Sequence, residues 1–244
     1  MNISFLSGMP RTGGTLLSSI LSQNEKLQTS GNSPLCQMMW DAQISCDMTE
    51  PMRNYPGLKS KFISSIPSIV YDNTDKHVID KCATWNLNGN MEIISKYITD
   101  NPKFIVTARP LLDIVKSFVF IRTMNGWRNP EEGLLEDNTD PLMRPLASFR
   151  NALSVRNHNF HFIKYDDLID NPSQTINDLY SFMEWEAFEH SFSNIRNKNK
   201  EKDYLINLIG LHDIRPVLKR RKIDIELSSE IKEKIEYLDI YNQI

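Results

Sequence analysis

The 244-residue sequence has little glycine, little cysteine and no long apolar run. Its nine glycines correspond to about half of the usual frequency of ~7%. With 40% hydrophobic and 24% charged residues, the composition excludes a disordered chain, a collagen and a disulfide-rich scaffold. The length fits one α/β domain, and we expect residues 1–244 to form a single domain.

The three cysteines, Cys36, Cys46 and Cys82, form no CxxC pair. This odd number excludes a disulfide framework and a tetrahedral zinc site, so we expect a reducing compartment and no metal. The first residues, MNISFLSGMP, are too short for a signal-peptide core, and no apolar run approaches the ~20 residues of a membrane helix. We therefore expect a cytoplasmic protein without membrane insertion.

Excess positive charge is also absent, since the formal charge is −3 and the isoelectric point is near 6.0. This balance argues against a general nucleic-acid binder but allows a local basic pocket for a small polyanion. The densest basic run is KRRK at 219–222. It is typical of a solvated surface as well as of an anion site, and both interpretations stay open.

Short apolar runs alternate with helical patterns along most of the chain. Strands are predicted at 2–7, 77–81, 103–109 and 159–165, and helices at 15–23, 88–100, 110–122 and from 171 onward. This alternation predicts a three-layer α/β/α domain with a mostly parallel sheet of four to five strands. Ligands of such sheets bind at the carboxyl ends of the strands.

A polar, non-periodic segment, 125–145, interrupts this alternation. It is rich in proline and asparagine, and we expect a long functional loop or lid at a substrate site. Trp127 is a candidate substrate contact because a large aromatic side chain in a polar loop is hard to explain as core. Met38, Met39 and Trp40 either line a substrate pocket or belong to the core.

The scarce glycines gather in one loop, GMPRTGGT at 8–15. This loop fits the phosphate-binding frame GxxxxGK[ST] except at Gly14, which replaces the lysine. Backbone N–H groups between a strand and a helix still form an anion cradle, although a tight turn without a ligand is the alternative. The missing lysine argues against an ATPase or GTPase, and Arg11 supplies a replacement charge.

Four segments in order resemble the P-loop sulfotransferases, which use 3′-phosphoadenosine 5′-phosphosulfate (PAPS) as the donor. GMPRTGGTLL is similar to the 5′-phosphosulfate loop of the tyrosylprotein-type and related bacterial enzymes. IVTARPLLDIVKSF resembles the 3′-phosphate site and implies roles for Arg109 and Ser117. VIDKCATW resembles a strand that ends in a functional lysine, Lys81. IKYDDLIDNPSQTINDLYSFM resembles a further segment of the family and places Tyr165 at a strand end.

A fifth segment, LHDIRPVLKRR, resembles the family's cofactor-closing loop more loosely, and it implies a closing segment at 205–225 with Arg215. The resemblance implies transfer of a sulfuryl group from PAPS to an acceptor hydroxyl or amine by in-line displacement, with 3′-phosphoadenosine 5′-phosphate (PAP) as product and no metal. Arg11 and Lys81 would be catalytic. The donor-binding residues would be Arg11, Thr12, Gly13, Gly14, Thr15, Leu16, Arg109, Ser117, Tyr165 and Arg215.

The sequence has no general base at the position where the resemblance predicts one. Asn32 and Ser33 stand where the tyrosylprotein-type enzymes carry a glutamate, and neither is a base at neutral pH. Asp41, about two helical turns further on, is one candidate. His212 and His77 are others.

Two other functions are compatible with the sequence. A P-loop kinase of a small molecule would use Asp80 as a magnesium ligand, and a non-catalytic nucleotide-binding module would need no base. The acceptor class is not specified, since a glycan, a lipid, a metabolite or a peptide would fit the same donor-binding core.

Overall fold

A five-stranded parallel sheet forms the centre of the computed structural model, which describes all residues except 73, 137–140, 200 and 221. The strand order is β2-β3-β1-β4-β5, and every neighbouring pair is parallel. The strands are β1 (Ile3–Gly8), β2 (Leu27–Asn32), β3 (His77–Lys81), β4 (Phe104–Ala108) and β5 (Phe160–Lys164). The parallel α/β sheet predicted from the sequence is therefore confirmed.

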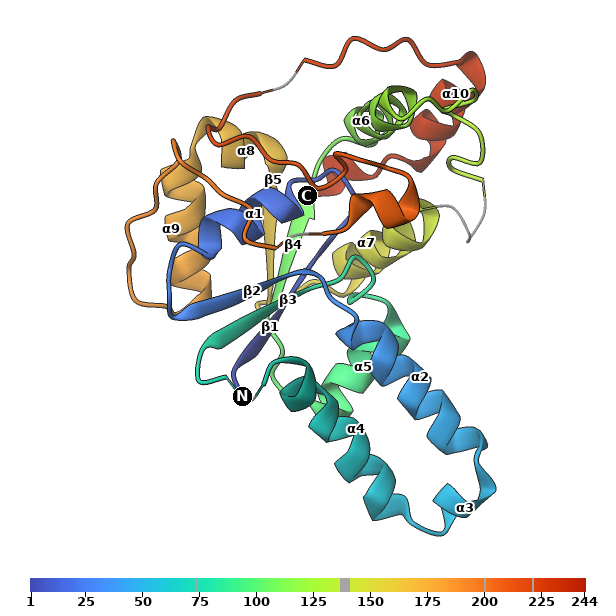
Figure 1. The fold of residues 1–244 in the computed structure, drawn as a ribbon, viewed down its shortest axis with the longest axis vertical. Helices are drawn as coiled ribbons and strands as arrows, with labels where there is room; N and C mark the ends of the chain where they lie inside the picture. Colours follow the sequence, from blue (N-terminus) through green and yellow to red (C-terminus); the bar gives the residue numbers. More distant parts are fainter. Residues whose placement is uncertain (73, 137–140, 200, 221) are drawn as a thin grey trace.

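Helices cover both faces of this sheet, as Figure 1 shows. On one face lie α1 (Gly14–Leu21), α8 (Tyr165–Asp170) and α9 (Pro172–Met183). The other face packs against α5 (Asn88–Tyr97), α6 (Leu111–Met124), α7 (Met143–Val155) and α10 (Ser229–Leu238). Two separate cores follow from the alternation of strand side chains, since Phe5 and Val78 belong to one core and Leu6 and Ile79 to the other.

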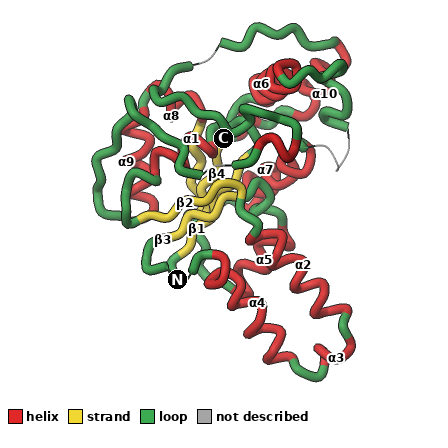
Figure 2. Tube along the Cα trace, viewed as in Figure 1, coloured by secondary structure: helices red, strands yellow, loops and turns green. Residues whose placement is uncertain are grey.

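Three helices extend away from the sheet at one end of the molecule (Figure 2). They are α2 (Leu35–Met48), α3 (Glu50–Arg53) and α4 (Pro56–Val70). Met39 of α2 and Ile63 of α4 are fully buried, so this extension shares the larger core. The core interpretation of Met39 is thereby the one that the structure shows.

The segment 125–145 is only in part a loop over the molecule. Leu134 and Leu135 are buried, and the Arg122 guanidinium of α6 donates to the backbone carbonyls of Pro130 and Glu132 at 3.1 and 2.8 Å. Part of the predicted lid, 137–140, lies outside the described residues. The segment ends in α7, which begins at Met143.

A long irregular stretch, 184–228, returns across the carboxyl ends of the strands (Figure 1). It contains the short 3₁₀ helix η1 (Asp203–Ile206), and a second one, η2 (Tyr241–Gln243), follows α10. In the described part of the chain, no helix has the length and apolar character needed to cross a bilayer. The three cysteines are free thiols.

Candidate functional site

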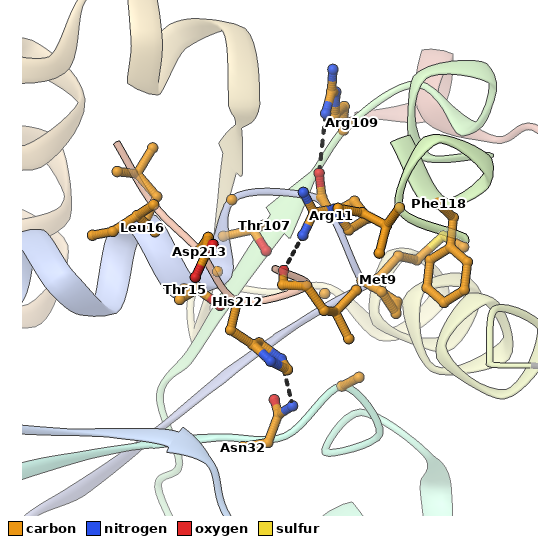
Figure 3. Close-up of a pocket in the computed structure, with 18 of the residues that line it drawn as sticks. Met9, Arg11, Thr15, Leu16, Asn32, Thr107, Arg109, Phe118, His212 and Asp213 are labelled. Atoms are coloured by element: carbon orange, nitrogen blue, oxygen red, sulfur yellow. Dashed lines mark hydrogen bonds between the residues drawn. The ribbon is translucent and has the colours of Figure 1, made fainter. Parts of the chain in front are cut away.

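A cavity of about 840 Å³ lies at the carboxyl ends of β1, β3 and β4 (Figure 3). The glycine loop, Lys81 and Arg109 form one side, and residues 206–219 close over it. Most of the donor-binding residues predicted from the sequence line this cavity, namely Arg11, Gly13, Gly14, Thr15, Leu16, Arg109, Tyr165 and Arg215. The other two, Thr12 and Ser117, are buried behind its wall.

The glycine loop is fastened to the neighbouring strand β4. Thr12 is buried, donates a hydrogen bond to the Met9 carbonyl at 2.6 Å and lies 2.7 Å from the Thr107 hydroxyl. Gly8 has a φ of +140°, and a Cβ atom at this position would lie 2.3 Å from the Thr107 Oγ1. Only glycine fits there, because the backbone of β1 passes so close to β4.

Helix α1 begins directly after this loop with free backbone donors. Gly13, with a φ of +93°, precedes the helix and has no side chain to cap it. The first N–H groups of a helix have no partner within the helix, and the helix dipole adds partial positive charge at this end. The start of α1 is therefore suited to an anion.

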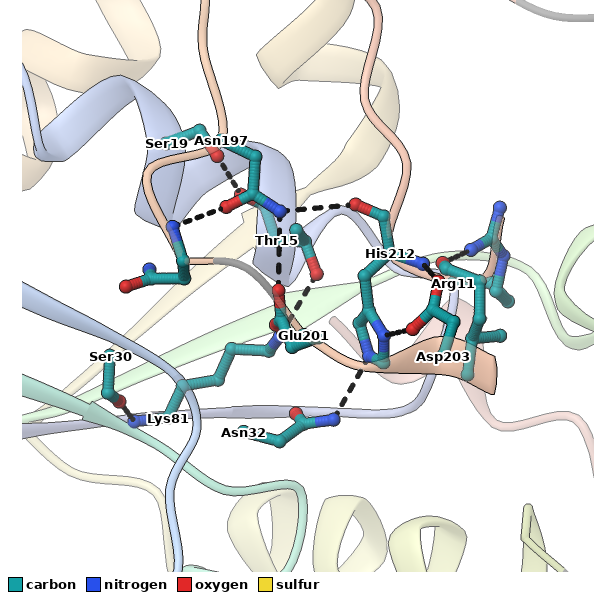
Figure 4. Close-up of polar contacts among 12 residues, drawn as sticks. Arg11, Thr15, Ser19, Ser30, Asn32, Lys81, Asn197, Glu201, Asp203 and His212 are labelled. Atoms are coloured by element: carbon teal, nitrogen blue, oxygen red, sulfur yellow. Dashed lines mark hydrogen bonds and ion pairs between the residues drawn. The ribbon is translucent and has the colours of Figure 1, made fainter. Parts of the chain in front are cut away.

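Lys81 brings an ammonium group to the same point from the end of β3. A Cβ atom on Gly14 would lie 3.6 Å from the Lys81 Cε, and the Lys81 Nζ donates to the Thr15 hydroxyl at 3.0 Å (Figure 4). The cation that the loop lacks at Gly14 is thus supplied by the adjacent strand. Burial lowers the pKa of Lys81, and the Glu201 carboxylate, 3.6 Å from the Nζ, acts in the opposite direction.

A second basic group lies beside the loop, between β4 and α6. The Arg11 Nε donates to the Ser117 hydroxyl at 3.0 Å, and another nitrogen of Arg11 donates to the Leu211 carbonyl. Arg109 donates to the Arg11 carbonyl at 3.3 Å, and its guanidinium lies 4.4 Å above the Tyr165 ring. Four residues that the sequence singled out from distant segments, Arg11, Arg109, Ser117 and Tyr165, are thus in contact.

The residues of the basic run at 219–222 contact different parts of the molecule. Lys219 lines the cavity, as the upstream Arg215 does, whereas Arg220 forms ion pairs with Asp166 at 2.8 Å and Asp170 at 2.6 Å. Arg220 therefore fastens the C-terminal stretch to α8. Residue 221 lies outside the described residues.

Other candidates from the sequence lie away from the cavity. Asp41 is exposed on α2 and accepts a hydrogen bond from Gln37 at 2.8 Å. His77 stands at the opposite end of β3 from Lys81, where burial and the nearby Lys103 lower its pKa to about 4. Trp127 stacks against the Arg122 guanidinium at 4.5 Å. None of the three is among the described residues that line the cavity.

Asp80, the magnesium ligand that a kinase would need, lies in the core on the opposite side of β3 from Lys81. It is fully buried and accepts hydrogen bonds from the Tyr71 hydroxyl at 2.5 Å and the Trp85 Nε1 at 2.7 Å. Burial raises the pKa of this carboxyl group. In the described part of the chain, no cluster of three or more His, Cys, Asp or Glu side chains is arranged to hold a metal ion.

The sequence did not single out the polar residues that approach the cavity from 196–203. Glu201 pairs with Lys81, and Asp203 lies 2.5 Å from the His212 ring. Asn197 links this stretch to His212, because its side chain donates to Glu201 at 3.2 Å and to the His212 carbonyl at 3.3 Å. The segment has no apolar periodicity and no motif, so only its fold-dependent contacts reveal these residues.

Comparison with known proteins gives one family. Residues 4–190 match the sequence profile of the sulfotransferase family. A search of curated proteins found no match.

Several solved structures share the fold. The sulfotransferase domain from the curacin biosynthetic pathway has a TM-score of 0.58 and 18% identity over 97% of this chain and 96% of its own. The sulfotransferase domain of the Synechococcus PCC 7002 olefin synthase has a TM-score of 0.55 and 16% identity, and the match covers 97% of this chain and 94% of that one. A mouse sulfotransferase complexed with PAP has a TM-score of 0.55 and 13% identity, and the match covers 97% of this chain and 83% of that one.

Proposed function

Because the chain belongs to the sulfotransferase family, and its reaction is therefore sulfuryl transfer, we propose that its donor is PAPS. The observation that carries this proposal is the presence of two basic sites in one cavity. One is the N-terminus of α1 with Lys81, and the other is Arg109 with Arg11, whose guanidinium Ser117 holds from behind the cavity wall. PAPS carries anionic groups at both ends of its ribose, whereas a nucleoside triphosphate carries them at one end.

The first site suits the 5′-phosphosulfate group. The amides of Gly14, Thr15 and Leu16 provide donors at the start of α1, and Lys81 provides a cation beside Thr15. Negative charge grows on the oxygen between sulfur and phosphorus as the sulfur–oxygen bond breaks. A fixed cation and fixed amides stabilise such charge without reorganisation, so we assign the main electrostatic role to Lys81.

The second site suits the 3′-phosphate. A guanidinium such as that of Arg109 binds a phosphate through two parallel hydrogen bonds, and here its Nε also lies 3.6 Å from the Asp113 Oδ2. The Arg11 backbone carbonyl accepts from Arg109, and the Arg11 guanidinium donates to the Ser117 hydroxyl. Arg11 also reaches the Leu211 carbonyl, so it links the loop, α6 and the closing segment 205–225. We propose that Arg11 couples closure of this segment to donor binding and catalysis.

The adenine is placed by the remaining cavity residues. Tyr165 offers an aromatic ring beside the loop, since a Cβ atom on Gly13 would lie 3.0 Å from its Cδ2. Arg215 lines the cavity from the closing segment and is available for the nucleotide. Base stacking on an aromatic ring with an arginine nearby is a common mode of nucleotide binding.

The burial of Asp80 argues against the kinase alternative. Both carboxylate oxygens of Asp80 already accept hydrogen bonds within the core, so this residue is not placed to bind magnesium at the cavity. In group transfer of this kind, most of the rate comes from holding the acceptor, the donor and the catalytic cation in the correct positions.

Calorimetric titration with PAP and with adenosine 5′-phosphate tests the proposed donor. The two ligands differ by the 3′-phosphate alone. We expect PAP to bind at least about 10-fold more tightly, which is the contribution of one charge-assisted contact. Equal affinities would show that the second basic site is not a 3′-phosphate site.

A further inference from the structure

A histidine in the cavity wall is held between an aspartate and an asparagine (Figure 4). The His212 Nδ1 lies 2.5 Å from the Asp203 Oδ1, and the His212 backbone N–H donates to the Asp203 Oδ2 at 3.0 Å. The His212 Nε2 lies 3.0 Å from the Asn32 Nδ2. The side chains of His212 and Asp203 are only 14% and 11% exposed, so the pair is fixed within the protein.

The partners determine which ring nitrogen carries the proton. An ionised carboxylate only accepts hydrogen bonds, so the Nδ1 of His212 must be the donor to Asp203. The Nε2 of the neutral ring then carries a lone pair, which accepts from the Asn32 amide. His212 is therefore held as a base whose basic nitrogen points to Asn32.

Asn32 lies next to the point of reaction. It ends β2 and is the register partner of Lys81, which ends β3. It also occupies the position at which the resemblance noted in the sequence places the glutamate of the tyrosylprotein-type enzymes. The lone pair of His212 consequently lies beside the strand ends where the acceptor must meet the donor.

We propose that His212 is the general base for the acceptor and that Asp203 is its positioning residue; this proposal rests on the proposed function. The acceptor oxygen forms a bond to sulfur while the bond between sulfur and the phosphate-linked oxygen breaks. PAP leaves with that electron pair, and the acceptor hydroxyl replaces the Asn32 amide at the His212 Nε2, which takes its proton. The Asp203 carboxylate stabilises the resulting imidazolium, which then loses its proton to solvent.

Glu201 is the other carboxylate at this side of the cavity. Its Oε1 lies 3.6 Å from the Lys81 Nζ, and its Oε2 accepts from Asn197. The donor's sulfonate competes for the same ammonium group, so Glu201 is placed to exchange with the donor rather than to face the acceptor. In the described part of the chain, the charged groups that line the cavity with His212 are Arg11, Lys81, Arg109, Asp213, Arg215 and Lys219, and Asp203 and Glu201 lie beside them.

Nitrogen NMR of the His212 ring, with PAP bound, tests the geometry without any acceptor. The His212→Asn variant identifies the signal. We expect the neutral form of the ring to carry its proton on Nδ1, and we expect Asp203→Asn to lose this preference. A proton on Nε2 in the wild type would overturn the proposal, whereas failure of PAP to bind would overturn the proposed donor.

Rates of PAP formation from PAPS test the chemistry, with 2-naphthol as the probe acceptor and water as the background acceptor. We expect His212→Asn to lower kcat by about 100-fold or more while the Kd for PAP stays within about twofold. His158→Asn, the same change at an exposed histidine, should retain the wild-type rate. An unchanged rate in His212→Asn, or a loss confined to Glu201→Gln, would overturn the assignment.

A second observation concerns the mouth of the same cavity. Met124, Ile206 and Ile209 line it, although they are 68%, 53% and 68% exposed. The Asn125 side chain donates to the Ile209 carbonyl at 3.0 Å and accepts from its N–H at 2.9 Å. The end of α6 and the stretch after η1 are thus held together, and they form one exposed apolar rim.

This apolar surface continues inward to the glycine loop. Phe118 and Ile121 of α6, Leu208 and Met9 line the cavity and are buried. None of these side chains can hydrogen-bond the hydroxyls of a sugar, and unpaired polar groups of a bound ligand are costly. The wall is instead suited to an alkyl chain or an aromatic ring.

We infer that the acceptor is a hydroxyl compound with an apolar body, which also rests on the proposed function. The rim is continuous with the cavity that contains Lys81 and His212, so the occupant argued here is the acceptor rather than a second protein chain. Its apolar body would lie along α6 and the 206–209 stretch. Its hydroxyl group would then reach the end of β3.

Acceptor preference tests this inference. We expect kcat/KM for 2-naphthol or 1-decanol to exceed that for N-acetylglucosamine or a polar tyrosine peptide by at least about 10-fold. A preference for the sugar or the peptide would overturn the inference. Donor binding, measured separately with PAP, shows whether the proposed function itself has failed.

Charged substitutions at the rim localise the effect. We expect Met124→Asp to raise the KM for 2-naphthol by at least about 10-fold without changing the Kd for PAP. Met48→Asp, the same change at an exposed methionine at the end of α2, is the matched control. If Met124→Asp instead dissociates a dimer and leaves KM unchanged, the rim binds a second copy and the inference is wrong.

Discussion

Lys81 and Asp80 are neighbours in the sequence, but their side chains lie on opposite sides of β3. Side chains alternate along a strand, so Asp80 enters the core while Lys81 reaches the cavity. Both are ionisable groups in buried surroundings, but the Asp80 carboxyl group accepts hydrogen bonds from Tyr71 and Trp85, whereas Lys81 faces a site that an anion can enter. At the residue scale, the functional assignment therefore depends on which side of β3 a side chain occupies.

The Lys81→Met variant tests this assignment. We expect kcat for sulfuryl transfer to fall by about 100-fold to 1,000-fold, because a fixed charge at the leaving oxygen is lost. The Kd for PAP should change by less than about 10-fold, since PAP lacks the sulfonate. Initial rates with labelled PAPS measure the first effect and calorimetry the second.

Lys76→Met is the matched control, because Lys76 is exposed just before β3. Thermal denaturation of both variants checks that each folds. A Lys81→Met enzyme with wild-type kcat would contradict the role of this cation.

Arg109 gives a separate prediction for donor binding. We expect Arg109→Ala to weaken PAP binding by about 10-fold to 100-fold, which corresponds to about 1.5–3 kcal/mol for hydrogen bonds to a charged group. Binding of adenosine 5′-phosphate should be almost unchanged, because it lacks the 3′-phosphate. Titration of both ligands measures the difference, and an equal loss for the two would contradict the 3′-phosphate role.

At the scale of elements, the strand order explains why the two basic sites share one cavity. Strand β1 is central, with β3 on one side and β4 on the other. The loop after β1 therefore lies between the end of β3, which carries Lys81, and the end of β4, which precedes Arg109. Parallel strands present all of these ends at the same edge of the sheet.

The start of β3 gives a pH-dependent prediction for stability. Burial, with the nearby Lys103, lowers the pKa of His77 to about 4, below its ordinary value of about 6.5. Between these two values the unfolded chain binds a proton that the folded chain does not. The stability that His77 contributes is therefore fully present above about pH 6.5 and is lost as the pH falls toward 4.

Chemical denaturation at pH 7 and pH 5 measures this effect. We expect the wild type to lose about 2 kcal/mol more of its free energy of unfolding over this range than the His77→Gln variant does. Groups common to both proteins cancel in the comparison. Equal losses in the two proteins would show that His77 is not held neutral by its surroundings.

Helices and strands with a clear local sequence pattern were predictable, and those without one were not. The strands β1, β3, β4 and β5 were found in the sequence, because each contains a short run of apolar or aromatic residues, although only Ile163 is buried in β5. Strand β2 was not found, since LQTSGN is polar and lies at the edge of the sheet, where most of its side chains are only partly buried. Helix α8 was also missed, because its six residues, YDDLID, were included in the segment after β5.

Site residues show the same division at the scale of the whole molecule. Lys81, Arg109 and the glycine loop were predicted, because each lies at the end of a recognisable strand and in a segment that resembles the sulfotransferases. Asp203 and Glu201 were not, since their importance comes from contacts with distant parts of the chain and their own segment has no pattern. Asp41 was a candidate base from helical spacing alone, and the structure places it on an exposed face of α2.

The C-terminal stretch forms one wall of the cavity. It is fastened to α1 by Lys198, which donates to the Ser22 carbonyl at 2.6 Å, and to the glycine loop through Arg11 and Leu211. The same stretch delivers His212 from one side of the cavity while β3 delivers Lys81 from another. The proposed donor site, the proposed base and the apolar rim are thus assembled from segments that are far apart in the sequence.

The most direct measurement is a paired transfer assay with 2-naphthol as acceptor. One arm contains PAPS labelled in its sulfuryl group, and the other contains ATP labelled in its γ-phosphate together with magnesium. We predict labelled naphthyl sulfate in the first arm and no labelled naphthyl phosphate in the second. Phosphate transfer from ATP without sulfuryl transfer from PAPS would contradict the account.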